Sequence, residues 1–155
     1  ERITDLALPY LKQAGLIEDN VSGEQYKWLL QVVGAVKHKL VSVSEIESYA
    51  KVFFPLTVKI TEQEAQAVLA GEQVPTVVRL FVSKLEQAEE LVPDKVKKLM
   101  KEITKELKLG GKQVFMPIRV VLTGEIHGPE LHELIPLIGV EEAKRRISQT
   151  LPGLL

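Results

Sequence analysis

The three histidines are the first residues to consider for chemistry. They are His38, His127 and His132, and Glu130 lies between the last two. Imidazole nitrogens and a carboxylate are ligands that zinc accepts, so this cluster would suit a small metalloenzyme if its side chains converged. Five positions turn a helix by about 500°, however, whereas residues four positions apart share one face, and Pro129 interrupts the spacing. We therefore expect solvent-exposed or helix-capping histidines, and the metalloenzyme stays as an alternative.

Other catalytic arrangements do not fit the sequence. It contains no Gly-x-Ser-x-Gly elbow, P-loop or dinucleotide fingerprint, and Gly110-Gly111-Lys112 lacks the spacing of a phosphate cradle between a strand and a helix. We expect these glycines to end a helix instead. The chain has no cysteine, which removes thiolate nucleophiles, thiolate metal ligands and disulfides. We therefore expect no catalytic residue, metal or cofactor in this chain.

The segment from Gly111 to Leu131 offers a different chemistry, which is the binding of an anion or a base. It holds a single arginine, Arg119, between two prolines that we expect at helix starts, Pro117 and Pro129. A guanidinium is a planar fork of donors for phosphate or for a base edge, and amides at helix starts bind anions. The alternative is that Arg119 pairs with an acid and that the segment only turns the chain.

Charge is distributed unevenly along the chain. The 155 residues carry a formal net charge of −1, which argues against a strong, diffuse polyanion binder. Between Lys95 and Arg119, however, eight basic residues stand against Glu102 and Glu106, a local net charge of +6. No run approaches the roughly 20 apolar residues that span a bilayer. We expect a cytosolic protein with one locally basic segment.

The spacing of apolar residues predicts an all-α fold, because these residues recur at three and four positions and the boundaries carry helix-capping residues. Hydrophobic residues make up 45% of the chain, enough for a packed core. Residues 56–60 alternate and are β-branched, but no partner strand is evident, so we expect an extended linker. The expected helices cover residues 6–14, 22–40, 42–54, 61–71, 77–85, 96–107 and 140–151.

Three of these helices are expected to start at capping boxes, and the last one to be amphipathic. The boxes open at Ser22, Ser42 and Thr61, each followed three residues later by Glu or Gln. The third helix should point Ile46, Tyr49 and Phe53 inward. The last should place Ala143, Ile147 and Leu151 on one face, and Lys144, Arg145 and Arg146 on the other.

A longer motif lies within the same arginine-containing segment. Pro117-x-Arg119-x-x-Leu122-Thr123-Gly124 is followed by Gly128-Pro129-x-Leu131 before the last helix. This resembles the C-terminal signature of bacterial-type glutamyl-tRNA synthetases. Leu6 to Leu11 with Gly15-Leu16, Trp28 with its apolar stripe, and Phe53-Phe54 extend the likeness over essentially the whole chain. The resemblance implies an anticodon-binding region without its catalytic half.

The resemblance also implies an architecture and a set of contacts. The fold would be two small helical subdomains, residues 1–54 and 55–155, that form a cage over the anticodon loop. Lys39 aligns with the place that monitors the third anticodon nucleotide. The implied contacts to the first two nucleotides are Arg119, Thr123, Pro129 and Leu131, flanked by Phe115 and Gln113, with Lys101, Lys105, Lys108 and Lys112 attracting the phosphate backbone.

The family's catalytic elements are absent from this sequence, which has no His-x-Gly-His element and no Lys-Met-Ser-Lys-like loop. The resemblance therefore places ATP, magnesium and glutamate in the parent enzyme. The implied partners are tRNA-Glu, with tRNA-Gln if the parent is non-discriminating, and the catalytic half of the same polypeptide. We expect a monomer that binds no membrane. An alternative is a helical protein-interaction scaffold, which requires an exposed apolar patch.

Overall fold

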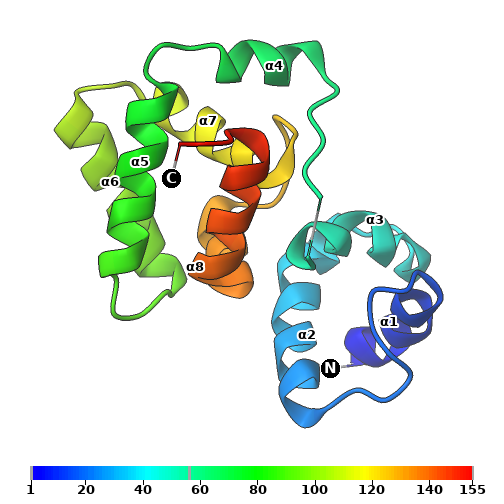
Figure 1. The fold of residues 1–155 in the computed structure, drawn as a ribbon. Coiled ribbons are helices and arrows are strands. Elements are labelled where there is room, and N and C mark those ends of the chain that lie inside the picture. Colours follow the sequence, from blue (N-terminus) through cyan, green and yellow to red (C-terminus); the bar gives the residue numbers. More distant parts are fainter. Residues whose placement is uncertain (1, 56, 155) are drawn as a thin grey trace. The chain divides into compact units, whose positions relative to one another are not determined.

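The computed structural model describes residues 2–55 and 57–154, and within these ranges it contains eight α-helices and no strand. The all-α prediction is confirmed. The chain divides into two compact units, Glu1–Leu56 and Thr57–Leu155. In chain order, the elements are α1 (Arg2–Gln13), α2 (Gly23–Val36), η1 (Lys37–Lys39), η2 (Val43–Glu45), α3 (Ile46–Ala50), η3 (Lys51–Phe53), α4 (Gln63–Leu69), α5 (Val74–Gln87), α6 (Pro93–Leu107), α7 (Gly111–Thr123) and α8 (Leu131–Thr150) (Figure 1).

The first unit is built from α1 to α3 and three short 3₁₀ turns around a small apolar core. The predicted cap at Ser22 is present, because its hydroxyl accepts from the Gln25 amide at 3.1 Å. Glu45 accepts from the Ser42 amide at 2.8 Å, which completes the predicted capping box there. Tyr49 is 36% exposed, so its predicted inward position is wrong. The buried core of this unit includes Leu11, Leu29, Val32, Val33, Ile46, Phe53 and Phe54.

The second unit consists of α4 and the packed helices α5 to α8 (Figure 1). Residues 57–60 form no helix or strand, in agreement with the expected linker, whereas Leu56 lies outside the described residues. The Thr61 capping box is wrong, because the N-cap of α4 is Glu62 and has no side-chain cap bond. Fully buried residues of this unit include Val77, Phe81, Leu85, Ile103, Ile118, Leu122 and Ile135.

The junction between α6 and α7 differs from the prediction. Helix α6 ends at Leu107, and Lys108 adopts the left-handed conformation (φ 55°) that we expected a glycine to supply. Gly110 is instead the N-cap of α7, where its amide donates to the Gln113 side chain at 2.8 Å. Helix α7 therefore begins at Gly111, six residues before Pro117, and the predicted helix start at Pro117 is wrong.

A proline inside α7 is tolerated because the carbonyl that it leaves without a partner is bonded elsewhere. Pro117 has no amide hydrogen, so the Gln113 carbonyl four residues earlier loses its helical donor. The side-chain amide of Gln73 donates to that carbonyl at 3.3 Å. The residue before α5 thus stabilises the helix that carries Arg119.

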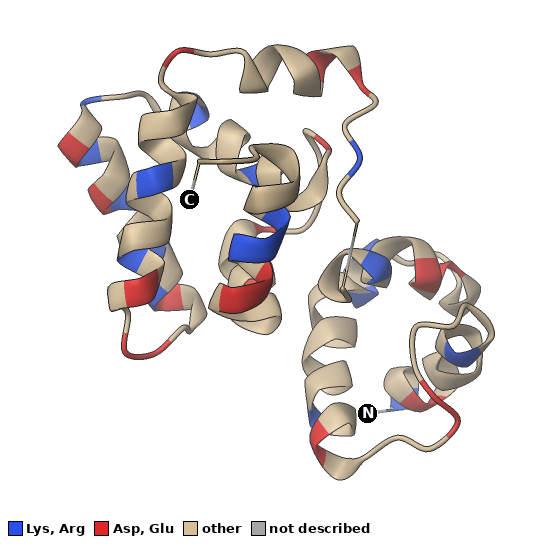
Figure 2. Cartoon of the chain, viewed as in Figure 1, with Lys and Arg blue, Asp and Glu red and all other residues tan. Residues whose placement is uncertain are grey.

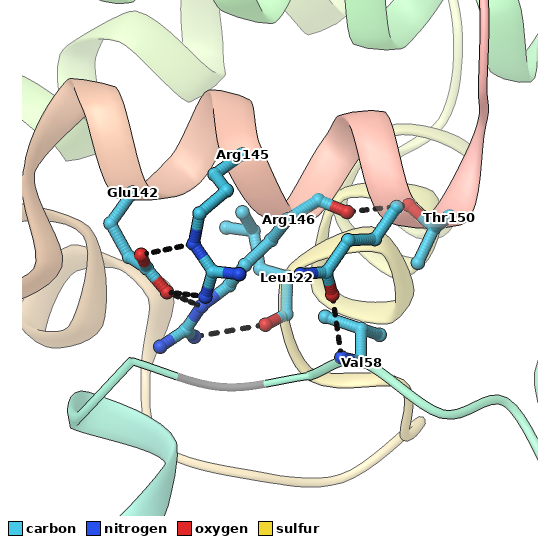
Figure 3. A network of polar contacts seen from close by, with 7 residues as sticks. Val58, Leu122, Glu142, Arg145, Arg146 and Thr150 are labelled. Atoms are coloured by element: carbon cyan, nitrogen blue, oxygen red, sulfur yellow. Dashed lines mark hydrogen bonds and ion pairs between the residues drawn. The ribbon is translucent and has the colours of Figure 1, made fainter.

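Helix α8 is two helical stretches joined at Gly139, which has φ 83° and ψ 169°. The second stretch matches the predicted last helix, but the predicted polar face is wrong at Arg146, whose exposure is 0%. Arg146 lies three residues after buried Ala143, and this spacing places both residues on the same side of the helix. Its charge is compensated by Glu142, 2.8 Å from Nε, and by the Leu122 carbonyl, 3.0 Å from Nη1 (Figure 3).

The linker packs against the C-terminal end of α7. The amide of Val58 donates to the Gln149 side chain of α8 at 2.8 Å. Gly124 follows α7 with φ 78°, and a Cβ at this position would lie 2.3 Å from the Lys59 carbonyl oxygen. Only glycine meets both requirements, because it has no Cβ and accepts positive φ. The Thr123-Gly124 motif therefore fixes where the linker crosses.

Candidate functional site

Arg119 is the centre of the candidate site. It is half-buried on α7, and its Nη1 donates to the Pro129 carbonyl oxygen at 2.8 Å. Gly128 lies directly beside the guanidinium, where an added Cβ would be 3.3 Å from Nη1. The loop before α8 thus contacts the arginine head group at Gly128 and Pro129. The alternative in which Arg119 pairs with an acid is not what the structure shows. Arg119 donates to a carbonyl, and Glu130 acts on it only through its nearby charge.

The guanidinium remains a cation in this setting. Burial lowers the pKa of Arg119 below its ordinary value, and the negative charge of Glu130 opposes that shift. An arginine stays protonated in proteins even after such a shift. One Nη1 hydrogen bond leaves several donors of the fork available for another molecule.

A pocket opens beside Arg119, between α6, α7 and the start of α8. Its volume is about 240 Å³, smaller than the roughly 300–1,000 Å³ that suits a drug-sized ligand. The pocket combines a buried apolar floor, an aromatic side chain that is 40% exposed, and charged groups of both signs. Its lining residues are Val96, Lys97, Met100, Lys101, Phe115, Arg119, Glu130, Leu131 and His132.

Helix α6 presents a ridge of lysines along one side of this pocket. Lys97, Lys101 and Lys105 are spaced four residues apart, so they lie on one helix face, and all three are exposed. Figure 2 marks the lysine and arginine positions of the second unit in blue. Two of the three acids of α6 are turned toward α5, where Lys84 contacts Glu102 at 3.2 Å and Glu106 at 3.1 Å. Glu102 and Glu106 therefore pair with a lysine of α5 and not with the lysines of the ridge.

Four of the predicted contact residues meet in this pocket. Phe115 and Arg119 are one helical turn apart on α7, Leu131 begins α8, and Lys101 comes from α6. Pro129 is buried beside them and supplies the carbonyl that holds Arg119. The structure therefore brings together residues from three separate elements.

The side chains of Thr123 and Gln113 make hydrogen bonds within the protein. The Thr123 hydroxyl is within 2.8 Å of the Arg119 carbonyl and accepts from the Glu125 amide at 3.1 Å, which closes the end of α7. The Gln113 side chain accepts from Gly110 at the start of the same helix. Neither side chain lines the pocket, so the structure gives both residues a supporting role.

The remaining predicted residues lie outside the pocket. Lys105, Lys108 and Lys112 are exposed on the second unit and extend the basic surface. Lys39 is exposed in η1 of the first unit. Sequence reasoning included Lys97 only within the basic segment and did not single it out as a contact, and it considered His132 and Glu130 only as metal ligands. The four-residue spacing of Lys97 and Lys101 was the available signal for the first of these.

The structure does not assemble the histidine cluster into a metal site. His127 lies in the loop before α8, whereas His132 is in its first turn. No group of three or more potential ligand side chains is placed to hold a metal ion within residues 2–55 and 57–154. In the same part of the chain, no helix is both long and apolar enough to cross a membrane.

A base-sized pocket with an aromatic wall and a guanidinium, bordered by a lysine ridge, defines a class of protein. RNA is usually read at unstacked bases, which side chains stack upon and bond at their edges, while lysines attract the phosphates. The fold and the residues of this pocket suit a helical RNA-binding module. The family model described as "Anticodon binding domain" matches residues 2–151. The chain belongs to this family.

Relatives of known name agree with this membership. The chain is 45% identical to a glutamate–tRNA ligase of Desulfitobacterium hafniense over 151 residues, and 40% identical to that of Bacillus subtilis over 147 residues. These matches cover 97% and 95% of the chain but only 31% and 30% of the relatives. The chain therefore spans about a third of their length.

The fold also matches solved structures. A glutamate tRNA ligase from Elizabethkingia meningosepticum superposes with a TM-score of 0.83 at 22% identity, over 99% of this chain and 29% of that one. A glutamate-tRNA synthetase from Elizabethkingia anophelis gives 0.73 at 24% identity, over 97% of this chain and 28% of that one. The TM-scores establish a shared fold, and at sequence identities this low they establish the fold alone.

Proposed function

We propose that this chain recognises the anticodon loop of tRNA-Glu as one part of a glutamate–tRNA ligase. The observation that carries the proposal is the pocket in which Arg119, held at 2.8 Å by the Pro129 carbonyl, borders Phe115 and the lysines of α6. Family membership over residues 2–151 and 45% identity to a glutamate–tRNA ligase support it.

Within this proposal the pocket residues divide the work. Phe115 offers a face on which a base can stack, and the fork of Arg119 donates to acceptors on the edge of that base. Leu131 forms part of the apolar floor. Lys101, Lys105, Lys108 and Lys112 attract phosphates without regard to sequence. Lys39, in the first unit, would monitor another anticodon nucleotide.

The activity and partners of the whole polypeptide are part of the same proposal. The remainder of such a ligase would join glutamate to tRNA with ATP and magnesium, and the two units of this chain would form the two halves of the anticodon cage. A non-discriminating parent would accept tRNA-Gln as well. We propose that the protein acts in the cytoplasm as a monomer.

The proposal is tested by a salt titration of binding to three RNA stem-loops. They carry the anticodon of tRNA-Glu, the anticodon of tRNA-Gln and a scrambled anticodon. Preference for the tRNA-Glu loop over the scrambled loop, with affinity that falls steeply with salt, is the expected result. Equal binding of all three, or no binding, would overturn the proposal. Binding of the tRNA-Gln loop reports whether the parent discriminates.

An exposed apolar row on α1 supports a second role for the first unit, which is contact with another part of the same polypeptide. Ile3, Leu6 and Tyr10 are 38%, 51% and 41% exposed, and their spacing places them on one side of the helix. Apolar rows of this kind commonly mark protein contacts. Leu6→Glu should leave loop binding by this chain unchanged and weaken its association with a separately supplied catalytic half. Unchanged association would remove this role.

A further inference from the structure

Glu130 is an acid in a pocket whose other charged lining residues are lysines and an arginine. It lines the pocket together with Lys97, Lys101 and Arg119, and it is exposed. Glu130 is the N-cap residue of α8, yet its side chain makes no cap hydrogen bond. Within residues 2–55 and 57–154, its carboxylate makes no hydrogen bond or ion pair, and it acts on Arg119 only through its charge. The carboxylate is therefore available to a molecule in the pocket.

The sign of this charge matters because of what two lysines and an arginine would otherwise bind. A site bordered by three cations suits phosphate, whose oxygens only accept hydrogen bonds. A carboxylate also only accepts, so it repels phosphate and offers phosphate no bond. The edge of every RNA base differs from phosphate in this respect, because each carries at least one N–H or amino donor beside its acceptors.

We propose that Glu130 determines the specificity of this pocket, admitting a base edge with a hydrogen-bond donor and excluding phosphate. This inference rests on the proposed function and assigns a selective role to one residue of the same site. Arg119 donates to an acceptor of the base while Glu130 accepts from its neighbouring N–H or amino group. The phosphates of the loop are left to the exposed lysine ridge along the side of the pocket, which continues beyond it at Lys105.

The rest of the pocket is built for a base in the same way. Val96, Met100 and Leu131 are 0%, 4% and 6% exposed, and they form a floor that a hydrated phosphate would not favour. Phe115 stands exposed at the side, where a flat ring can stack. Lys105 continues the ridge one turn beyond Lys101, outside the pocket lining. Because base and phosphate are directed to different places, the loop can sit in only one register.

The first test compares Glu130→Gln with Glu133→Gln in the full 155-residue chain. Glutamine keeps the size and removes the charge, and Glu133 loses the same charge from the same turn of α8 without lining the pocket. The affinity of each variant is measured for the tRNA-Glu stem-loop and for the scrambled stem-loop, and urea unfolding checks that each variant is folded. We expect Glu130→Gln to reduce discrimination between the loops by about tenfold, the scale of one base contact. Glu133→Gln should retain the wild-type ratio.

The outcomes separate the two claims. If the wild-type chain prefers the tRNA-Glu loop and both variants keep that preference, the role of Glu130 is overturned while the proposed function stands. If the wild-type chain has no preference, the proposed function fails, and the inference fails with it.

A second test needs no RNA. Inorganic phosphate is titrated into each protein while the NMR signals of the Phe115 ring and the Arg119 Nε–H are followed. We expect Glu130→Gln to bind phosphate in the pocket about tenfold more tightly than wild type, because a like charge at a few ångströms has been removed. Equal phosphate binding by wild type and Glu130→Gln would overturn the exclusion of phosphate.

Discussion

The Arg146 guanidinium on α8 donates from Nη1 to the Leu122 carbonyl oxygen on α7 at 3.0 Å. Leu122 lies in the last turn of α7, where carbonyls have no donor within their own helix. A buried cation on one helix thus caps the helix that carries Arg119. Glu142 completes the arrangement by accepting from Arg146 Nε at 2.8 Å (Figure 3).

Replacing Arg146 should therefore destabilise the second unit. Arg146→Met leaves the Leu122 carbonyl without its donor and removes the buried partner of Glu142, at a cost of about 3 kcal/mol. Urea unfolding followed by circular dichroism measures this cost. Arg145→Met is the matched control, because Arg145 contacts the same Glu142 at 2.6 Å from an exposed position and should contribute under about 1 kcal/mol. Equal costs would contradict a capping role for Arg146.

A second prediction concerns the glycine at the end of α7. Gly124→Ala combines a positive φ with a Cβ that would lie 2.3 Å from the Lys59 carbonyl oxygen, so the linker must move. Gly15→Ala has the same φ of 78° and open space around the new methyl group. The control should cost about 1–2 kcal/mol, the cost of the left-handed conformation alone. Gly124→Ala should cost more, measured by amide hydrogen exchange in each unit. A smaller cost at Gly124 would show that the linker yields freely.

Arg119 is predicted to read the loop through its planar fork as well as its charge. Arg119→Ala should weaken binding to the tRNA-Glu loop by about 1–3 kcal/mol, and the lost Pro129 bond should lower stability by about 1 kcal/mol. Arg119→Lys keeps the charge and should still lose discrimination, because an ammonium lacks the fork. Arg79→Ala, on an exposed arginine outside this pocket, should leave discrimination unchanged. Full discrimination by Arg119→Lys would show that Arg119 contributes only its positive charge.

The lysine ridge should determine the salt dependence of binding. Lys101→Gln and Lys105→Gln should each flatten the slope of log affinity against log salt by about 0.7, the value for one phosphate contact on a single strand. Lys95→Gln removes the same charge from a position off the ridge, about 120° around α6 from Lys101. Its slope should match that of the wild type. A change at Lys95 as large as that at Lys101 would indicate attraction by net charge alone.

Lys84 gives α5 and α6 a pH-dependent link. Hydrogen bonds to Glu106 and Glu102 raise the pKa of Lys84 above its ordinary value of 10.5. A raised pKa means that the stabilisation is fully present below pH 10.5 and is lost as pH rises through the folded-state pKa. Wild type should unfold at higher urea concentration than Lys84→Met at pH 8, by a margin worth under about 1 kcal/mol. That margin should disappear at strongly alkaline pH. A margin that does not change with pH would show that the charge of Lys84 does not stabilise the protein.

Local signals in the sequence predicted much of the fold. Ser22 and Ser42 cap helices as expected, because capping depends on residues within one turn. Pro117 and Arg146 were misplaced because the groups that accommodate them, Gln73 and the Leu122 carbonyl, are distant in sequence. Capping rules cannot foresee partners that only tertiary packing supplies.

The pocket was predictable only in part for the same reason. Phe115 and Arg119 are one turn apart on a single helix, so their common face follows from spacing. The placement of Lys97 beside Glu130 depends on how α6 packs against α8, which no local pattern encodes. The family motif named Arg119, Leu131 and Thr123 alike as contacts; the first two line the pocket, whereas the Thr123 hydroxyl closes α7.

The interruption of α8 at Gly139 also bears on how such proteins diversify. In an unbroken helix, one inserted residue turns everything beyond it by about 100°. Here the stretch that borders the pocket and the stretch that holds Arg146 have separate rotational settings, because Gly139 is not helical. A change in the length of the first stretch can therefore be absorbed at Gly139 while the second stretch keeps its packing against α7. One continuous segment thus contains two parts that can be re-engineered independently.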